Sequence, residues 1–184
     1  MDISVEFNDR EVLDVLRQIM DRATPKGMRL AMKEIGESLV ASTMQRFALS
    51  SAPNGSPWPA LAEGTVLARL AKITGTYYKR TDKNKEKGLA GKLNARGTRA
   101  AAGIKPLIDT GGLRRSISYR IIDGGAGVEI GTNRFSGEWK GGAAVHQFGS
   151  RDGRIPARPF IGMSENDKRT VLEILQELLF SAAR

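Results

Sequence analysis

The stretch from Pro25 to Leu49 reads PKGMRLAMKEIGESLVASTMQRFAL and decides the fold. Apolar side chains recur along it every three or four residues, at Met28, Ala31, Met32, Ile35, Leu39, Met44 and Phe47. This period places them on one face of an α-helix, which at the standard rise is about 35 Å long. Thr24 is a suitable cap, and proline is tolerated at the first helical position. The sequence therefore predicts a long amphipathic helix.

Shorter elements flank this helix. Before it, VEFNDREVLDVLRQIMDR predicts another helix, because Asn8 and Glu11 have capping-box spacing and one face is apolar, through Val12, Leu13, Leu16, Ile19 and Met20. After it, SSAPNGSPWP at 50–59 contains three prolines and a glycine and predicts a loop. A short helix is expected from Glu63 to Ile73.

The chain changes character after Pro106. Two β-prone runs, Ser116–Ile122 and Gly127–Gly131, are separated by a glycine-rich turn at 123–126 and predict a hairpin. The run Ala143–Phe148 suits either a third strand or a short helix, and the sequence leaves both open.

A closing helix is expected from Ser164 to about Phe180. Ser164 and Asp167 have capping-box spacing, and the expected apolar face consists of Val171, Leu172, Leu175, Leu178 and Leu179. Together these elements predict an α+β fold over a single domain, 1–184, in which the long helix and the C-terminal helix pack on a small antiparallel β-sheet.

Basic residues are concentrated in one segment, residues 74–105, which we call the basic arm. It carries nine Lys or Arg against Asp82 and Glu86, so it holds +7 of the net charge of +9. Its bases are Lys79, Arg80, Lys83, Lys85, Lys87, Lys92, Arg96, Arg99 and Lys105. Gly-rich and without a sustained period, it is expected to be disordered or a loose hairpin in isolation. Tyr77 and Tyr78 lie near its start, and aromatic residues beside basic ones suit a docking arm on an acidic protein or a contact with phosphates. We favour docking on protein slightly.

Composition argues against an enzyme. With no cysteine and one histidine, disulfides, thiolate nucleophiles, Cys-ligated zinc and His-pair metal motifs are excluded. Neither a G-x-S-x-G elbow nor a P-loop is present, and Asp109 and Glu129 lack a spacing that pairs carboxylates. No apolar run approaches the about 20 residues that span a bilayer, and from the composition of the first residues we expect no secretory signal. We therefore expect no catalysis, cofactor, metal, small-molecule substrate or membrane partner.

Three local patterns allow two interpretations each. Trp58 is either a plug that seals the core or an exposed anchor at a subunit interface. Thr110-Gly111-Gly112 is favoured as a turn that caps a one-turn helix, over an anion site beside Arg114 and Arg115. His146 is favoured as a hydrogen-bonded side chain in a core or interface, over a catalytic group.

Short motifs in a fixed order also point to a family. They are Trp58-Pro59-x-Leu61, Ile108-x-Thr110-Gly111-x-Leu113-x-x-Ser116-Ile117, Val128-x-Ile130-Gly131-Thr132, His146-Gln147-x-Gly149 and Pro156-Ala157-Arg158-Pro159-Phe160-x-Gly162-x-Ser164-x-x-Asp167. Their succession over 58–167 resembles the phage virion morphogenesis (tail-completion) family. In this pattern the prolines at 156 and 159 hold an extended segment, Phe160 plugs the core, and the Arg158 side chain is expected to be free for a bidentate pair.

The resemblance implies a structural virion protein of a tailed bacteriophage. Such a protein completes the tail end or the neck and helps to join tail to head, as a ring, commonly hexameric, around the DNA channel. Its implied partners are further copies of itself and the neighbouring neck, connector and tail-tube proteins, with non-specific contact to DNA in the channel as an additional one. Its implied location is the virion, and the host cytoplasm during assembly. The alternative is a small basic protein that binds nucleic acid non-specifically through the basic arm.

Overall fold

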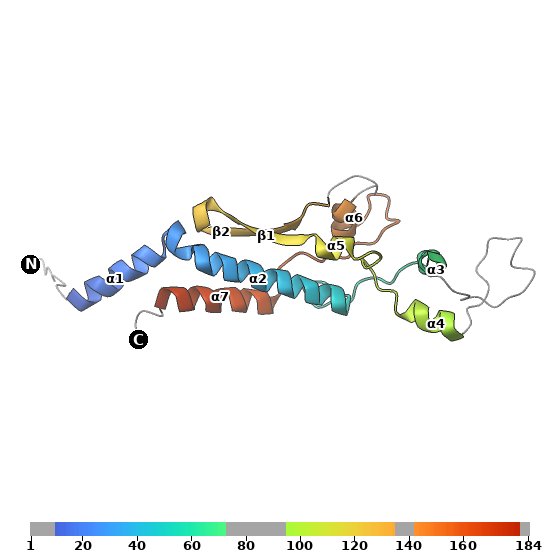
Figure 1. Cartoon of the computed structure of the whole chain (residues 1–184), viewed down its shortest axis with the longest axis horizontal. Coiled ribbons are helices and arrows are strands. Elements are labelled where there is room, and N and C mark those ends of the chain that lie inside the picture. Colours follow the sequence, from blue (N-terminus) through green and yellow to red (C-terminus); the bar gives the residue numbers. More distant parts are fainter. Residues whose placement is uncertain (1–9, 73–94, 135–141, 181–184) are drawn as a thin grey trace, which may run out of the picture. The chain divides into compact units, whose positions relative to one another are not determined.

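The computed structural model describes residues 10–72, 95–134 and 142–180, which contain the elements in Figure 1. In chain order these are α1 (Arg10–Arg22), α2 (Pro25–Leu49), α3 (Glu63–Lys72), α4 (Ala95–Ala102), α5 (Gly112–Arg115), β1 (Ile117–Ile122), the 3-10 turn η2 (Asp123–Gly125), β2 (Gly127–Thr132), α6 (Gly142–Phe148) and α7 (Glu165–Phe180). Two strands, β1 and β2, form a hairpin sheet, so the α+β prediction is confirmed. None of the described helices is long and apolar enough to cross a membrane.

The described chain divides into two compact units. The first contains the described parts of Met1–Thr43, Ile117–Gly131 and Ile161–Arg184, and the second those of Met44–Ser116 and Thr132–Phe160. The prediction of one domain over the whole chain stays a prediction.

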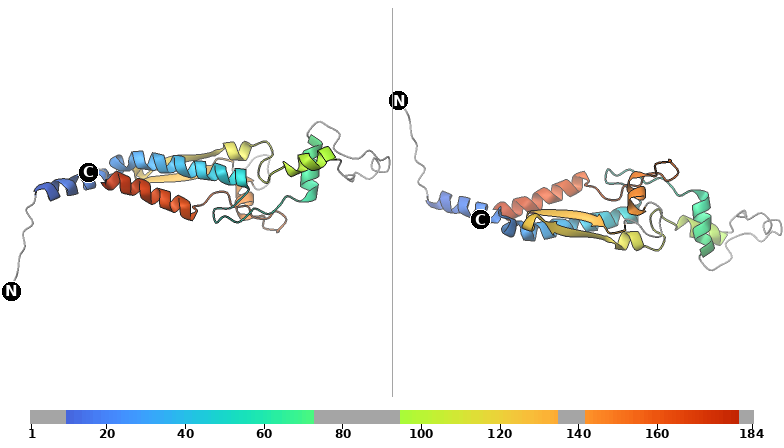
Figure 2. Two further views of the ribbon diagram at one scale, coloured as in Figure 1. Left: turned by 90° about the horizontal axis from the view of Figure 1, so that it is seen from below. Right: turned by 90° about the horizontal axis from the view of Figure 1, so that it is seen from above.

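The core of the first unit lies along α2, as the apolar period predicts. Met32, Ile35 and Leu39 are buried there, and side chains of β2 (Val128 and Ile130) and α7 (Val171, Ile174 and Leu175) pack against them. In Figures 1 and 2 the hairpin and α7 accordingly lie along different sides of α2. The hairpin approaches α2 closely at Gly36, where a Cβ would fall 2.6 Å from Cγ of Tyr119. Helix α2 therefore packs on the hairpin as predicted, while α7 packs on α2.

Helix α7 begins with the predicted capping box. The Ser164 N–H donates to Oδ2 of Asp167 at 2.7 Å, and the Asp167 N–H donates to Oγ of Ser164 at 3.1 Å. One part of its predicted apolar face is wrong: Leu172 is 58% exposed, while Ile174 belongs to the core instead. Leu172 and Ile174 are two positions apart, which separates their side chains by about 200° around the axis of α7. The face of α7 that packs on α2 is therefore rotated from the predicted one.

Helix α1 keeps much of its predicted apolar face uncovered. It contacts α7, and Nη1 of Arg22 donates to the carbonyl of Leu178 at 2.9 Å. Leu16 and Met20 are nevertheless 50% and 70% exposed. These two apolar side chains of the predicted face are therefore left uncovered in the single chain. Asn8, with its expected capping box, lies outside the described residues.

The second unit has an aromatic core. Phe47 contacts Trp58 edge-on and Phe160 at a tilt, with ring centroids 5.5 Å apart in each pair. The predicted loop at 50–59 folds back through an antiparallel bridge between Ser51 and Pro57, which brings Trp58 onto Phe47. These contacts position the residues of the candidate site.

Two further predictions concern short helices of this unit. The helix expected from Glu63 is α3, which buries Leu70 completely. The run from Ala143 is the helix α6, so of its two interpretations the helix is confirmed. The last part of the basic arm differs from expectation, because residues from Ala95 to Ala102 form α4 and contact α3, with Gly97 buried. A glycine and small alanines allow this close approach, which propensity alone does not predict.

Candidate functional site

Trp58 and the motif Pro156–Phe160 are in contact within the second unit. Trp58 is 6% exposed, and its Nε1–H donates to the carbonyl of Pro159 at 2.8 Å. Phe160 is 1% exposed and packs on Phe47, as the motif implies. Of the two interpretations of Trp58, the plug of the core is therefore confirmed, and its ring is not available as an exposed anchor.

Arg158 corrects one expectation of the motif. Its side chain is bidentate but not free, since Nε donates to the carbonyl of Pro59 and Nη2 to that of Ala60, each at 2.7 Å. Arg158 as a residue is 4% exposed, and burial, followed by the charge of Arg69, lowers the pKa of its guanidinium. Arg158 thus clamps the loop that follows Trp58. Pro156 is exposed, at the start of a segment without helix or strand.

The His-Gln-x-Gly motif supports the same segment from α6. Oε1 of Gln147 accepts the N–H of Phe160 at 3.0 Å, and the carbonyl of His146 accepts the N–H of Arg158 at 2.7 Å. Gly149 has φ 85°, and a Cβ there would fall 3.2 Å from the backbone of Ala157. Glycine is favoured at this position because the positive φ strains any other residue and the close approach leaves little room for a Cβ.

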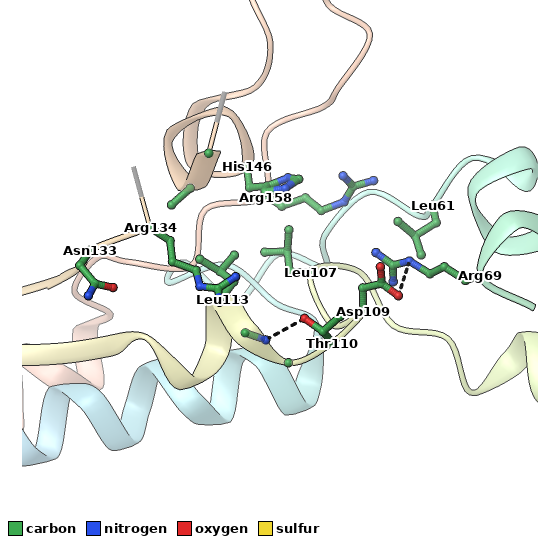
Figure 3. Close-up of a pocket in the computed structure, with 14 residues that line it drawn as sticks. Leu61, Arg69, Leu107, Asp109, Thr110, Leu113, Asn133, Arg134, His146 and Arg158 are labelled. Carbon is green, nitrogen blue, oxygen red and sulfur yellow. Dashed lines mark hydrogen bonds and ion pairs between the residues drawn. The ribbon is translucent and has the colours of Figure 1, made fainter. Parts of the chain in front are cut away.

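These contacts leave a cavity of about 330 Å³ in the second unit, shown in Figure 3, which we call the arginine-lined cavity. It combines cationic and apolar side chains from α3 and the segment before it, α5 and the segment before it, the segment after β2, and α6 and the segment after it. Its lining is Leu61, Arg69, Leu107, Asp109, Thr110, Gly111, Gly112, Leu113, Asn133, Arg134, Gly142, Ala143, His146 and Arg158. Six residues of the family motifs therefore line this one cavity: Leu61, Thr110, Gly111, Leu113, His146 and Arg158.

Cations outnumber acids around this cavity. Its acid is Asp109, which lies 3.8 Å from Nε of Arg69 and 3.4 Å from Nζ of Lys72. Arg69 also donates from Nη1 to the carbonyls of Lys105 and Ile108, at 2.9 and 3.0 Å. Asp109 is thus already shared by two cations. Since Arg134 and Arg158 line the cavity as well, the lining carries a positive excess.

His146 lies beside Arg158 in Figure 3. Burial lowers its pKa first, and the charges of Arg158 and Arg69 lower it further, so the imidazole is neutral at pH 7. Its buried Nδ1 has no hydrogen-bond partner among the described residues. The expectation of a hydrogen-bonded imidazole is therefore wrong for Nδ1 in the single chain.

The Thr110-Gly111-Gly112 segment forms the favoured turn into a one-turn helix, but the N-cap residue is Gly111 and not the expected Thr110. Gly111 has φ 73° and precedes α5, and Oγ1 of Thr110 accepts the N–H of Gly112 at 3.3 Å. After α5, Oγ of Ser116 and Oγ1 of Thr132 are hydrogen-bonded at 2.6 Å, which ties the two ends of the hairpin. In the first unit, Gly131 has open space where a Cβ would stand, so packing does not require glycine there.

The structure places only the end of the basic arm. Arg96 and Arg99 are exposed on α4, and Nζ of Lys105 donates to the carbonyl of Ala48 at 2.5 Å. The other candidates in the arm lie outside the described residues; these are Tyr77, Tyr78, Lys79, Arg80, Lys83, Lys85, Lys87 and Lys92. The prediction that the arm docks on a partner stays a prediction.

Several residues of the cavity were not predicted as site residues, among them Arg69, Leu107 and Arg134. Single arginines and leucines form no recognisable motif in a sequence. Only the tertiary fold brings these residues together around the arginine-lined cavity. Among the described residues, no group of three or more His, Asp or Glu could hold a metal ion. Glu129 pairs with Arg120 at 2.6 Å and Asp109 with Arg69 and Lys72, so each carboxylate has cationic partners of its own.

Fold and site together define a small α+β protein with a cation-lined cavity. The chain belongs to the phage virion morphogenesis family, whose model matches residues 7–179. The resemblance in the short motifs is thus confirmed, and membership gives the protein a structural role in a bacteriophage virion.

A curated relative supports this assignment. The Mu-like prophage FluMu G protein 2 of Haemophilus influenzae is 38% identical over 77 residues, which are 39% of this chain and 50% of the relative. The chain thus spans about half the length of the relative that it matches. No solved structure matches the chain significantly.

Proposed function

We propose that the protein completes the tail end or the neck of a tailed phage and helps to join tail to head. It does so as a homo-oligomeric ring, with six copies as the expected number, around the channel through which DNA passes. The family match over residues 7–179 is the observation that carries this proposal. The prophage origin in the name of the relative agrees with it.

Uncovered apolar side chains in the first unit support assembly with further copies. Leu16 and Met20 on α1 and Leu172 and Phe180 on α7 are all at least half exposed. Large apolar side chains grouped on a surface are typical of protein interfaces. A ring needs two different patches on each copy, because its contacts are heterologous. The faces of α1 and α7 would supply one of them.

The basic arm would supply a second contact. Its cations are suited to clasp an acidic surface on the next copy or on a neighbouring neck, connector or tail-tube protein. Because +7 of the net charge lies in this one segment, non-specific binding of nucleic acid through the arm is the second candidate function. The two candidates make different predictions for the isolated protein.

Light scattering during size-exclusion chromatography tests the proposal. Six copies of 20.0 kDa would give about 120 kDa. A variant with the six bases of 79–92 replaced by Gln keeps the length of the arm. We expect it to fold, as judged by circular dichroism, and to form fewer rings. The matched control replaces six exposed basic residues outside the basic arm by Gln. These are Lys26, Arg29, Arg114, Arg151, Arg154 and Arg169.

The control removes the same charge and is expected to assemble normally. If six arm bases met DNA phosphates instead, log K for duplex DNA would fall against log salt with a slope of about −5. A protein that stays monomeric and binds random duplex DNA with that slope would contradict the ring and favour the second candidate.

A further inference from the structure

Three nitrogen-bearing side chains around the arginine-lined cavity, Arg158, Arg134 and His146, have no anionic partner among the described residues. Arg158 is only 4% exposed, yet none of the described carboxylates lies within ion-pair distance of its guanidinium. Both of its side-chain hydrogen bonds go to neutral carbonyls. A buried cation is costly unless an anion and hydrogen bonds compensate it.

Arg134 is the second of these groups. A Cβ on Gly112 would fall 2.7 to 2.9 Å from atoms of the Arg134 guanidinium, so the guanidinium lies over the backbone at the start of α5. The Arg134 side chain makes no hydrogen bond or ion pair with any residue in the described part of the chain. Since it is exposed at the edge of the cavity, its planar fork is available for a bidentate contact.

His146 is the third. Its Nδ1 is buried without a hydrogen-bond partner among the described residues, although nearly all buried polar atoms in native proteins have one. A neutral imidazole carries one N–H, which can lie on Nδ1 and donate to an anion. One occupant that accepts hydrogen bonds and carries negative charge would therefore suit all three groups.

The remaining lining limits what this occupant can be. Leu61, Leu107 and Leu113 make part of the cavity apolar, and about 330 Å³ is within the range of cavities that take a small ligand or a few side chains. A carboxylate on a short apolar-flanked segment matches both parts of the lining. A phosphate of DNA is less suitable, since the leucines would be left without an apolar partner.

We propose that the arginine-lined cavity binds the carboxylate of an Asp or Glu side chain, flanked by apolar residues, on a neighbouring protein of the virion. The carboxylate pairs with Arg134, accepts the Nδ1–H of His146 and compensates the charge of Arg158. This deepens the proposed function, on which it rests for the identity of the neighbour as a virion protein. Binding itself can be measured on the isolated protein.

The single histidine makes the test specific. His146 is the one imidazole of the chain, so its NMR signals report on this cavity alone. The probe is the blocked tripeptide acetyl-Val-Glu-Phe-amide, and its matched control is acetyl-Val-Gln-Phe-amide. We expect the Glu peptide to shift the His146 signals saturably and to raise the pKa of His146, because an anion offsets the nearby arginine charges. The Gln peptide should bind about tenfold more weakly or worse.

Variants of the full chain complete the test. Arg134→Gln should abolish saturable binding of the Glu peptide, and Arg134→Lys should keep part of it. Arg151→Gln, which removes an exposed charge away from the cavity, should leave binding unchanged. Equal binding of both peptides, no response of His146, or normal binding to the Arg134→Gln variant would overturn the proposal.

Inorganic phosphate and a short duplex DNA are tested in parallel. If either shifts the His146 signals at lower concentration than the Glu peptide does, the cavity is a phosphate site and the carboxylate proposal is wrong. Ring formation by light scattering is measured separately, so failure of this proposal and failure of the proposed function can be told apart.

Discussion

Gly36 on α2 provides a sharp test of how the hairpin packs in the first unit. In the interior of a helix, Gly→Ala ordinarily stabilises by about 1 kcal/mol. Here a Cβ would fall 2.6 Å from Cγ and 2.9 Å from Cε2 of Tyr119. Such overpacking costs about 1–3 kcal/mol. For Gly36→Ala we therefore expect a net loss in the free energy of unfolding of about 1 kcal/mol.

The assay is unfolding in urea, followed by far-ultraviolet circular dichroism, with thermal unfolding beside it. For a chain of this size, 1 kcal/mol corresponds to a fall in Tm of about 2–4 °C. The matched control is Gly64→Ala on α3, where nothing lies within 4 Å of the added Cβ. That variant should be as stable as the wild type or up to about 1 kcal/mol more stable.

A double-mutant cycle links the loss to Tyr119. With Tyr119→Val in place, the ring is absent, so Gly36→Ala should no longer destabilise. A coupling free energy of about 1–3 kcal/mol is expected between the two sites, which is typical of residues in contact. The packing described here would be refuted if Gly36→Ala stabilised as much as Gly64→Ala, or if the two substitutions were additive.

Three further predictions concern the site and the closing helix. Because the pKa of His146 is lowered in the fold, the unfolded chain takes up a proton first as the pH falls. The contribution of His146 to the free energy of unfolding is therefore full above about pH 6.5 and decreases below it. His146→Gln should abolish this loss of stability between pH 7 and 5, as measured by urea unfolding. Arg158→Lys should cost about 1–3 kcal/mol in the same assay, since an ammonium cannot serve the carbonyls of Pro59 and Ala60 as the guanidinium does; a change near zero would contradict the clamp. Ser164→Ala should cost about 1 kcal/mol through loss of the cap on α7, whereas Ser164→Asp should recover most of it.

The sequence was sufficient for the elements whose signals are local. The apolar period of α2 and the capping box at Ser164 and Asp167 depend on residues within a few positions of each other, and both are confirmed. The sequence assigns Leu172 to the apolar face of α7, but the structure leaves its side chain exposed. Periodicity defines an apolar face that is wider than the part of the helix that a neighbouring element covers. For the same reason, Leu16 and Met20 lie on an amphipathic face that the single chain leaves exposed.

The cavity could be predicted only in part. The short motifs point to residues such as His146 and Arg158, but the meeting of these residues with Arg69 and Arg134 depends on tertiary packing between segments far apart in the chain. The role of Arg158 was wrong because its acceptors are backbone carbonyls, which carry no sequence signal. Helix α4 was missed because α3 stabilises it, while its own composition is unremarkable.

Electron microscopy of particles made by a phage that lacks this gene tests the proposed role most directly. We expect filled heads and separate tails, or tails with unfinished ends, and almost no infectious virions; the wild-type gene supplied from a plasmid should restore joining. Intact, infectious virions at the normal titre in its absence would contradict a function at the joint between head and tail.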